Sequence, residues 1–364
     1  MRGRSSEQVT MLSLRTPEKR VPADHPLRQV KVLVDDALDA LRVDLDKMYS
    51  KVGRASVPPE RLLKASLLMA LYTVRSERLF CEQLDYNLLF RWFLDMNIDD
   101  PSFDHSTFSK NRQRLLDHQI GEKFFVCVVE QARAAGLLSA EHFTVDGTLI
   151  EAWASMNSFR PKDASSQKTD PPDDPSNPTV NFHGDKRKNT THASTTDPEA
   201  KLIRKGKGKE AKLCFAAHAL MENRNGLLVD FRVTEATGTA EREAALEMID
   251  ASMPTAKTRK TLGADAGYDV KQFVADCRAR NVTPHVAAHR NGWSALDGRT
   301  KRHRGYTISQ RLRKRVEEIF GWMKTVGNFR KTRYRGVART QLAGYFTGAA
   351  LNLLRMTRLL EIPT

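Results

Sequence analysis

The spacing of apolar residues changes near residue 140, and this change limits most strongly the folds that the chain can adopt. Over residues 28–137, apolar residues recur every three to four positions, which is the spacing of amphipathic helices. Beyond this stretch, short β-rich runs alternate with helical segments. We therefore expect an all-helical N-terminal domain over residues 1–137 and a second domain over residues 138–364.

The first part of the chain contains several predicted helices. We expect them over residues 33–48, 58–71, 77–95 and 124–135. Ser106 or Thr107, which follow a break at Asp100-Pro101, are expected to cap one further helix. Gly136 stands where a helix C-terminus favours glycine.

The second part predicts a mixed α/β (α+β) fold. Strands are expected over residues 143–150, 213–220, 227–234, 261–265 and 283–288. Helices are expected over residues 241–252, 270–280, 309–326 and 341–360. The turn at residues 223–226 predicts a hairpin between the second and third strands. This order of elements suits a mixed sheet with helices on its faces.

Residues 155–212 interrupt this pattern. Apolar residues become rare there, six of the fifteen prolines fall within the segment, and the run Lys205-Gly206-Lys207-Gly208-Lys209 closes it. We expect a long loop or a partly disordered insertion. Its mixed charge fits a solvated surface loop as well as it fits a DNA contact.

The chain carries a surplus of positive charge. Its 59 lysines and arginines outnumber 44 acidic residues, which gives a formal net charge of +15. Such a surplus favours a polyanionic partner, and nucleic acid is the expected one, although a merely basic protein also fits. The sequence lacks an apolar run of about 18 residues, so we expect no membrane partner and a cytoplasmic, nucleoid-associated protein. The four cysteines lack the spacing of metal ligands and are expected to be buried free thiols.

Two aspartates stand where a strand pattern expects an apolar residue or a strand end. Asp146 lies inside the β-rich run over residues 143–150, and Asp265 ends the short run over residues 261–265. Phosphodiester chemistry with hard cations needs carboxylates that converge from different elements. For Asp146 the alternative is a turn residue at a strand end, because Asp-Gly is a common turn pair. Asp269 also follows the second run, and we interpret it as a helix N-cap.

Glu317 is the candidate for a third acid. On the helix predicted over residues 309–326, Arg313 lies one turn before Glu317 and Lys324 two turns after it, on nearly the same face. The alternative is an ordinary solvated helix with ion pairs. Residues 299–339 favour the first interpretation, because fourteen basic residues stand there against two acids, Glu317 and Glu318.

Together these residues resemble the DDE transposases of bacterial insertion sequences, in particular the insertion-sequence-5-like group. The signature of that family around its third acid is Y-x2-R-x3-E-x6-K. Arg313, Glu317 and Lys324 match it, whereas Gln310 replaces the tyrosine, and Glu318 does not keep the spacing to a lysine. Val145-Asp146-Gly147-Thr148 and Ala264-Asp265-Ala266-Gly267-Tyr268 are similar to the neighbourhoods of the other two acids. The resemblance covers about residues 45–360.

The resemblance implies a ribonuclease-H-like catalytic domain that cuts DNA at element ends and joins it to target DNA. Asp146, Asp265 and Glu317 would be the catalytic residues and would hold two Mg²⁺ ions, or Mn²⁺. The N-terminal helices would recognise terminal inverted repeats, and the protein would act as a homodimer on DNA. We expect DNA contacts from seven basic residues of the C-terminal part, namely Arg313, Arg315, Lys324, Arg330, Lys331, Arg333 and Arg335.

Two other functions fit parts of the sequence. A non-enzymatic DNA-binding regulator would use the helical N-terminus and the basic C-terminal stretch, and it would bind DNA without metal-dependent cutting. A ribonuclease-H-like nuclease would cut DNA without rejoining its ends. The three acids argue against the regulator, and the family resemblance alone argues against the nuclease.

Overall fold

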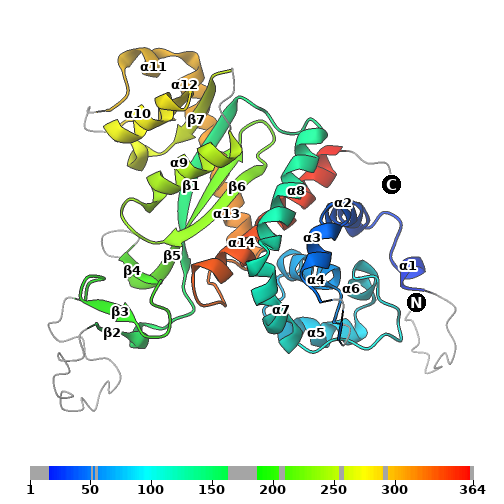
Figure 1. Cartoon of the computed structure of the whole chain (residues 1–364). Coiled ribbons are helices and arrows are strands. Elements are labelled where there is room, and N and C mark those ends of the chain that lie inside the picture. The colour runs from blue at the N-terminus through cyan, green and yellow to red at the C-terminus, as the bar shows by residue number, and fades with distance from the viewer. Residues whose placement is uncertain are drawn as a thin grey trace, which may run out of the picture.

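The computed structural model describes residues 16–50, 52–53, 56–162, 187–204, 210–253, 258–289 and 294–360. Figure 1 shows a group of N-terminal helices on one side and a mixed sheet with its own helices on the other. Two long helices, α8 (Ile120–Ala134) and α14 (Val337–Leu360), run between them. None of the described helices is both long and apolar enough to pass through a membrane.

The N-terminal part is helical, as the apolar spacing predicts. Its first helices are α1 (Pro17–Arg20), α2 (Leu27–Ala40), α3 (Arg42–Lys47) and α4 (Pro59–Leu71). They are followed by α5 (Glu77–Tyr86), α6 (Leu88–Phe93), α7 (Ser106–Asp117) and α8. The prediction of a single helix over residues 77–95 is wrong, because the helix is interrupted at Asn87. The Asn87 side chain accepts hydrogen bonds from the backbone N–H groups of Leu89 and Phe90, and so it starts a second helix.

The beginning of α7 also differs from the prediction. Ser106 is the first residue of the helix and not its cap. The carboxylate of Asp104 accepts a hydrogen bond from the Ser106 N–H at 2.8 Å, a role that the sequence interpretation gave to Ser106 or Thr107. At the other end of this region, α8 stops just before Gly136, whose φ of +69° is the left-handed conformation that favours glycine.

A mixed sheet forms the centre of the second part. Its strands are β1 (His142–Glu151), β4 (Lys201–Arg204), β5 (Ala211–Glu222), β6 (Leu228–Glu235), β7 (Lys260–Ala264) and β8 (Val282–Val286). The order across the sheet is β4-β5-β1-β7-β8, and β6 also pairs with β5. β5 is antiparallel to β1, β4 and β6, whereas β7 is parallel to both β1 and β8. The predicted strands and the hairpin at residues 223–226 are confirmed.

The described parts of residues 155–212 are more ordered than a long loop. A short 3₁₀ turn, η1 (Met156–Ser158), leads into β2 (Phe159–Pro161), which pairs with β3 (His192–Ser194), while β4 extends the main sheet. Phe159 and Ala200 of this stretch belong to the hydrophobic core, and the Asn189 amide bonds both the N–H and the carbonyl of Leu202 in β4. Residues 163–186 and the lysine run at 205–209 lie outside the described residues.

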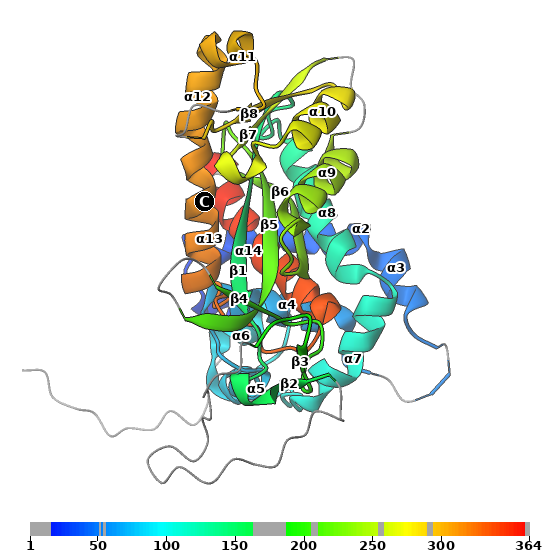
Figure 2. The ribbon, with the colours of Figure 1, turned by 90° about the vertical axis from the view of Figure 1, so that its left-hand side faces the viewer.

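Helices cover both faces of the sheet. They are α9 (Ala240–Ser252), α10 (Lys271–Ala279), α11 (Gly298–Arg302), α12 (Arg304–Leu312) and α13 (Val316–Thr325), followed by α14. In Figure 2, α12 and α13 form one line along one side of the sheet, with α9 and α10 on the other side. The helix predicted over residues 309–326 begins five residues earlier, at Arg304, and contains a 3₁₀ turn, η4 (Arg313–Arg315).

One hydrophobic core runs through both parts of the chain, and α14 lies at its centre. On one side α14 packs against β6, where a methyl group on Gly344 would lie 2.3 Å from the Phe231 ring. On this side the buried Asn352 amide also bonds the N–H and the carbonyl of Leu228. On the other side α14 packs against α8, α4 and α2. The same helix therefore completes the sheet and the helical region.

Candidate active site

Asp146 lies in the middle of β1, a ten-residue strand that continues to Glu151. It is opposite Ala219 of β5, so the strand-end turn considered from the sequence is wrong. Its carboxylate accepts a hydrogen bond from the Gly147 N–H at 2.8 Å. Burial raises the pKa of Asp146 to about 6, and the negative charges of Asp265 and then Glu241 add to the rise.

Asp265 follows β7 directly and lies beside Asp146. In the parallel pairing of β1 with β7, Thr144 is opposite Gly263, and each aspartate stands two residues further along the chain. Residues two apart on a strand share a face, so the register brings the two carboxylates together. Asp265 also fixes the following turn, η3 (Ala266–Tyr268), by accepting a hydrogen bond from the Gly267 N–H at 2.8 Å.

The helical line from α12 to α13 covers the face of the sheet that carries Asp146. It comes close to β7 at Gly263, where a methyl group would lie 3.1 Å from the Thr144 Oγ1 and 3.5 Å from the Arg313 Cβ. Further along, the Lys324 Nζ donates a hydrogen bond to the Thr148 Oγ1 at 2.6 Å. Thr144, Asp146 and Thr148 alternate along β1, so Arg313 and Lys324 lie on either side of Asp146 along that face.

The N-terminal half of this helical line is anchored to β8. The Ser309 hydroxyl bonds the Nδ1 of the buried His285 at 2.7 Å, and the Tyr306 hydroxyl donates to the Val286 carbonyl at 3.0 Å. Gln310, which stands in place of the family's tyrosine, donates to the His285 carbonyl and accepts a hydrogen bond from Arg313 at 3.1 Å. Gln310 therefore orients Arg313 on the site.

Glu317 is exposed on α13, between Arg313 and Lys324 in sequence and on nearly the same helical face. In the part of the chain that the structure describes, no three acidic, histidine or cysteine side chains are already close enough to hold a metal ion. The structure thus brings Asp146 and Asp265 together and leaves Glu317 on the helix that covers them.

Glu241 is a neighbouring carboxylate that the sequence analysis missed. It lies in the first turn of α9, and a methyl group on Gly147 would lie 2.8 Å from its Oε1. Although the residue as a whole is exposed, burial of its carboxylate raises the pKa of Glu241, and the charge of Asp265 raises it further. An acid in a first helical turn is an ordinary feature of sequences, so local pattern gave no sign of this tertiary contact.

Two buried side chains follow Asp265. Tyr268 is 1% exposed, and its hydroxyl has no hydrogen-bond partner among the described residues. Asp269 is also buried and accepts a hydrogen bond from the Ala295 N–H at 2.8 Å. The interpretation of Asp269 as the N-cap of a helix is wrong, because Val270 precedes α10 and the Asp269 carboxylate holds a distant loop instead.

The other predicted DNA contacts fall into two groups. Arg330 and Arg335 are exposed, and so is Lys331, which forms an ion pair with Glu151 at 3.2 Å. Arg315 reaches the carbonyls of Asn223 and Arg224 at 3.3 and 3.4 Å.

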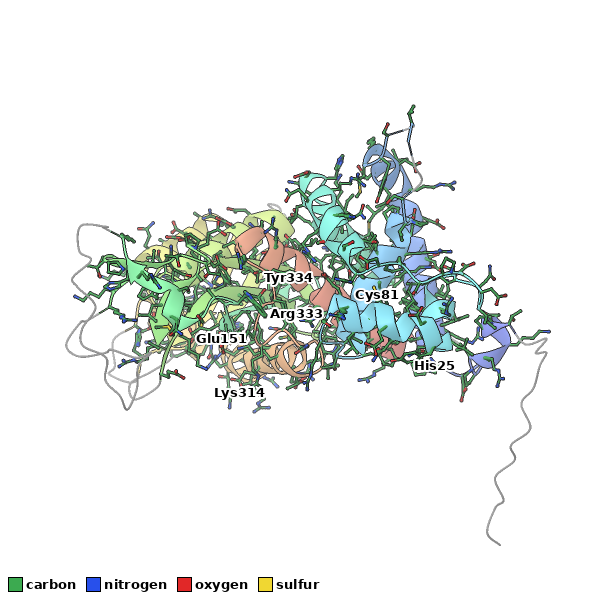
Figure 3. The ribbon with its side chains drawn as sticks, turned by 90° about the horizontal axis from the view of Figure 1, so that it is seen from below. His25, Cys81, Glu151, Lys314, Arg333 and Tyr334 are labelled. Atoms are coloured by element: carbon green, nitrogen blue, oxygen red, sulfur yellow. The ribbon has the colours of Figure 1, made fainter. Side chains whose placement is uncertain are left out.

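Arg333 instead enters a crevice of about 90 Å³ between the N-terminal helices and the residues before α14. It donates there to the Val74 carbonyl at 2.9 Å. Figure 3 shows Arg333 and Tyr334 at this junction, and Lys314 at the outer edge of the α12–α13 line.

Two family models match the chain. Residues 15–114 match the family described as Transposase domain (DUF772), and residues 178–353 match the family described as Transposase DDE domain. Asp265, Glu317 and Glu241 lie inside the second match, whereas Asp146 lies between the two. No curated protein is significantly similar to the chain in sequence.

Solved structures similar to the chain include two transposase assemblies. A piggyBac transposase synaptic complex with hairpin DNA has 10% identity and a TM-score of 0.41, covering 93% of this chain and 82% of that chain. A pre-cleavage Mos1 transpososome has 10% identity and a TM-score of 0.21, covering 92% of this chain and 97% of that chain.

Proposed function

Because the chain is a DDE transposase of the insertion-sequence type, we propose that its sheet-containing part is a ribonuclease-H-like catalytic domain. Asp146, Asp265 and Glu317 form the catalytic centre of that domain. The enzyme cleaves DNA strands at the ends of an element and transfers them into target DNA. The observation that supports the assignment is the parallel pairing of β1 with β7 up to Thr144 and Gly263, because Asp146 and Asp265 each follow two residues later.

The chemistry of these donors fits divalent metal ions, which DDE transposases generally use. Asp265 lies near enough to Asp146 for its negative charge to raise the pKa of Asp146, in addition to the larger effect of burial. Within the described parts of this basic chain, neither aspartate forms an ion pair. Hard cations bind carboxylate oxygens, and we propose two Mg²⁺ ions, for which Mn²⁺ can substitute. Bound ions of this kind activate the attacking water or 3′-hydroxyl and stabilise the leaving oxygen.

Glu317 completes the site from the covering helix. Arg313 packs against Gly263, beside Thr144 of β1, and Lys324 donates a hydrogen bond to Thr148. The line from η4 to α13 therefore passes over β1 on both sides of Asp146. Glu317 lies between these two residues on nearly the same face, and it is exposed and unpaired within the described residues. Its carboxylate is therefore available to the site without breaking an existing ion pair.

Arg313 and Lys324 would hold the DNA backbone at the scissile phosphate. The Arg313 charge already acts on Asp146, where it lowers the pKa against the effect of burial. Lys324 is held beside β1 by its bond to Thr148. Fixed cationic donors next to the reacting phosphate are suited to stabilise negative charge that develops there.

Substrate recognition would use the rest of the basic surface. We propose that the N-terminal helices over residues 1–137 recognise the terminal inverted repeats, and that residues 138–364 form the catalytic domain. The exposed Arg330 and Arg335 are suited to bind phosphates, since nothing in the described structure buries them. Transposition requires two element ends to be brought together, and we propose a homodimer on DNA for this step.

Cleavage of a labelled DNA that carries the element's own end tests the catalytic centre. With Mg²⁺ or Mn²⁺, the wild type should nick the DNA at the end junction, whereas Asp146→Asn and Asp265→Asn should bind the same DNA without cutting it. Cleavage retained by Asp146→Asn would contradict the assignment. A pre-cut end supplied with a target plasmid then distinguishes a transposase from a simple nuclease, because only the transposase joins the two.

A further inference from the structure

Glu241 reaches the catalytic strand from the face opposite to α13. Gly147 follows Asp146, so a side chain at this position would extend from the opposite face of β1, on which α9 lies. A methyl group on Gly147 would lie 2.8 Å from the Glu241 Oε1, and 3.1 Å from both the Cδ and the Cγ of the same side chain. The absence of a side chain at Gly147 is thus what leaves room for the Glu241 carboxylate.

The pairing of the strands leaves this carboxylate access to the aspartates. β1 and β7 are hydrogen-bonded only over residues 142–144 of β1, so their described ladder ends before Asp146. The beginning of α9 also meets the turn that follows Asp265, because the Arg242 side chain donates a hydrogen bond to the Gly267 carbonyl at 3.4 Å. The charge of Asp265 raises the pKa of both Asp146 and Glu241.

These three carboxylates share a second property. Within the described residues none of Asp146, Asp265 and Glu241 forms an ion pair, although the chain carries 59 basic residues. Asp230 and Asp250, in contrast, pair with Arg232 and Arg280. A group of unpaired like charges is unfavourable unless a cation joins it.

The hydroxyl of Tyr268 gives independent evidence for a ligand at this point. It is buried, it has no hydrogen-bond partner within the described structure, and the charges of Glu241, Asp146 and Asp265 all act on it. A buried hydroxyl without a partner costs free energy. A hydrated cation between the carboxylates would bring water within reach of that hydroxyl.

We propose that Glu241 is a further carboxylate of the divalent-cation site, contributed by α9 together with Asp146 and Asp265. This proposal rests on the proposed function. In the described residues the carboxylates do not yet converge closely enough to hold a metal. Binding must therefore draw them together, and Glu241 can move toward the aspartates because its contact with Gly147 involves the flexible end of its side chain.

Titration of the full-length, DNA-free protein with Mn²⁺, followed by electron paramagnetic resonance, tests the proposal without measuring activity. Glu241→Gln should weaken Mn²⁺ binding by about tenfold or more, as the loss of a carboxylate at a metal site does. Glu243→Gln is the matched control, because Glu243 is an exposed acid in the same helical turn, and it should bind Mn²⁺ as the wild type does. Equal Mn²⁺ affinity of Glu241→Gln and the wild type would overturn the proposal.

Gly147→Ala adds a test that leaves every carboxylate in place. The new methyl group should displace the Glu241 carboxylate and weaken Mn²⁺ binding in the wild type, but it should have no further effect in Glu241→Gln. Additive effects of the two substitutions would contradict a role through Glu241. Melting curves of the metal-free variants establish that each is folded.

The same titration separates this proposal from the proposed function. If Asp146→Asn and Asp265→Asn weaken Mn²⁺ binding and Glu241→Gln does not, the further inference fails alone. If the two aspartate variants bind Mn²⁺ as tightly as the wild type, the proposed catalytic centre itself fails.

Discussion

The Lys324 Nζ lies 2.6 Å from the Thr148 Oγ1, and this hydrogen bond joins α13 to the strand that carries Asp146. Thr148 stands two residues after Asp146 and shares its face of the strand. The bond therefore fixes the distance between α13 and β1. Any displacement of α13 would change the surroundings of both Asp146 and Glu317.

Lys324→Ala should reduce cleavage without abolishing it. The substitution removes a cationic donor beside the site, but it leaves all the carboxylates in place. Loss of the hydrogen bond should also lower the free energy of unfolding by about 1–2 kcal/mol. Lys314→Ala is the control, because Lys314 is exposed at the outer edge of the same helical line. Cleavage rates and urea denaturation measure the two effects, and equal behaviour of both variants would contradict the role of Lys324.

Asp146→Asn should stabilise the metal-free protein at neutral pH. The pKa of Asp146 in the folded protein is about 6, above its ordinary value of 3.8, so the folded state binds this proton more tightly than the unfolded state. The free energy of unfolding should therefore fall as the pH rises from about 4 to about 6, by roughly 1–3 kcal/mol. Asp146→Asn removes this dependence. Urea denaturation between pH 4 and pH 8 in the presence of a chelator measures it, and identical pH profiles would show that Asp146 ionises normally.

Glu317→Gln should abolish metal-dependent cleavage while the free energy of unfolding changes by less than about 0.5 kcal/mol. The small change in stability is expected because Glu317 is exposed and has no ion pair within the described residues. Its neighbour Glu318 provides the matched control, since Glu318 lies 3.4 Å from Arg355 and faces another part of the molecule. Glu318→Gln should cleave DNA normally. Loss of cleavage in Glu318→Gln, and not in Glu317→Gln, would reassign the third acid.

Arg333→Ala and Arg335→Ala should affect different properties. Arg333 donates to the Val74 carbonyl inside the crevice, so its removal should destabilise the protein by about 1–3 kcal/mol. Arg335 is exposed, so its removal should leave the stability unchanged. It should reduce the slope of log K for DNA binding against log salt concentration by about the amount of one phosphate contact. Binding measured at several salt concentrations, together with melting curves, distinguishes them. The reverse pattern would show that Arg333 contacts DNA.

The elements that the sequence predicted well are those with a strong local pattern. The strands that carry or precede Asp146 and Asp265 were predicted from their apolar pattern, and the two aspartates were selected because a carboxylate interrupts or ends that pattern. The parallel pairing of those strands brings the two positions near each other, while their catalytic role stays a prediction. Glu317 was selected by its spacing from Arg313 and Lys324. The structure places that spacing along one helical line over the sheet.

The elements that the sequence did not predict depend on contacts between distant segments or on competition between side chains. Glu241 meets β1 only because Gly147 leaves space for it, and neither residue signals the other along the chain. The side chains of Asn87 and Asp104 accept hydrogen bonds from backbone N–H groups at the beginnings of α6 and α7. These two helices therefore begin at residues that the apolar spacing did not indicate. β4 forms in a stretch with few apolar residues, where the Asn189 side chain hydrogen-bonds both the N–H and the carbonyl of Leu202.

The position of α14 limits whether the N-terminal helices of one transposase can be combined with the sheet-containing part of another. Because α14 packs against both β6 and the N-terminal helices, residues 1–137 cannot be exchanged for those of a relative without changing a packed interface. A chimera that takes these residues from a relative would inherit a surface matched to the donor's own last helix. Replacing the N-terminal helices, which we propose to recognise the element ends, therefore requires the facing side of α14 to be exchanged with them.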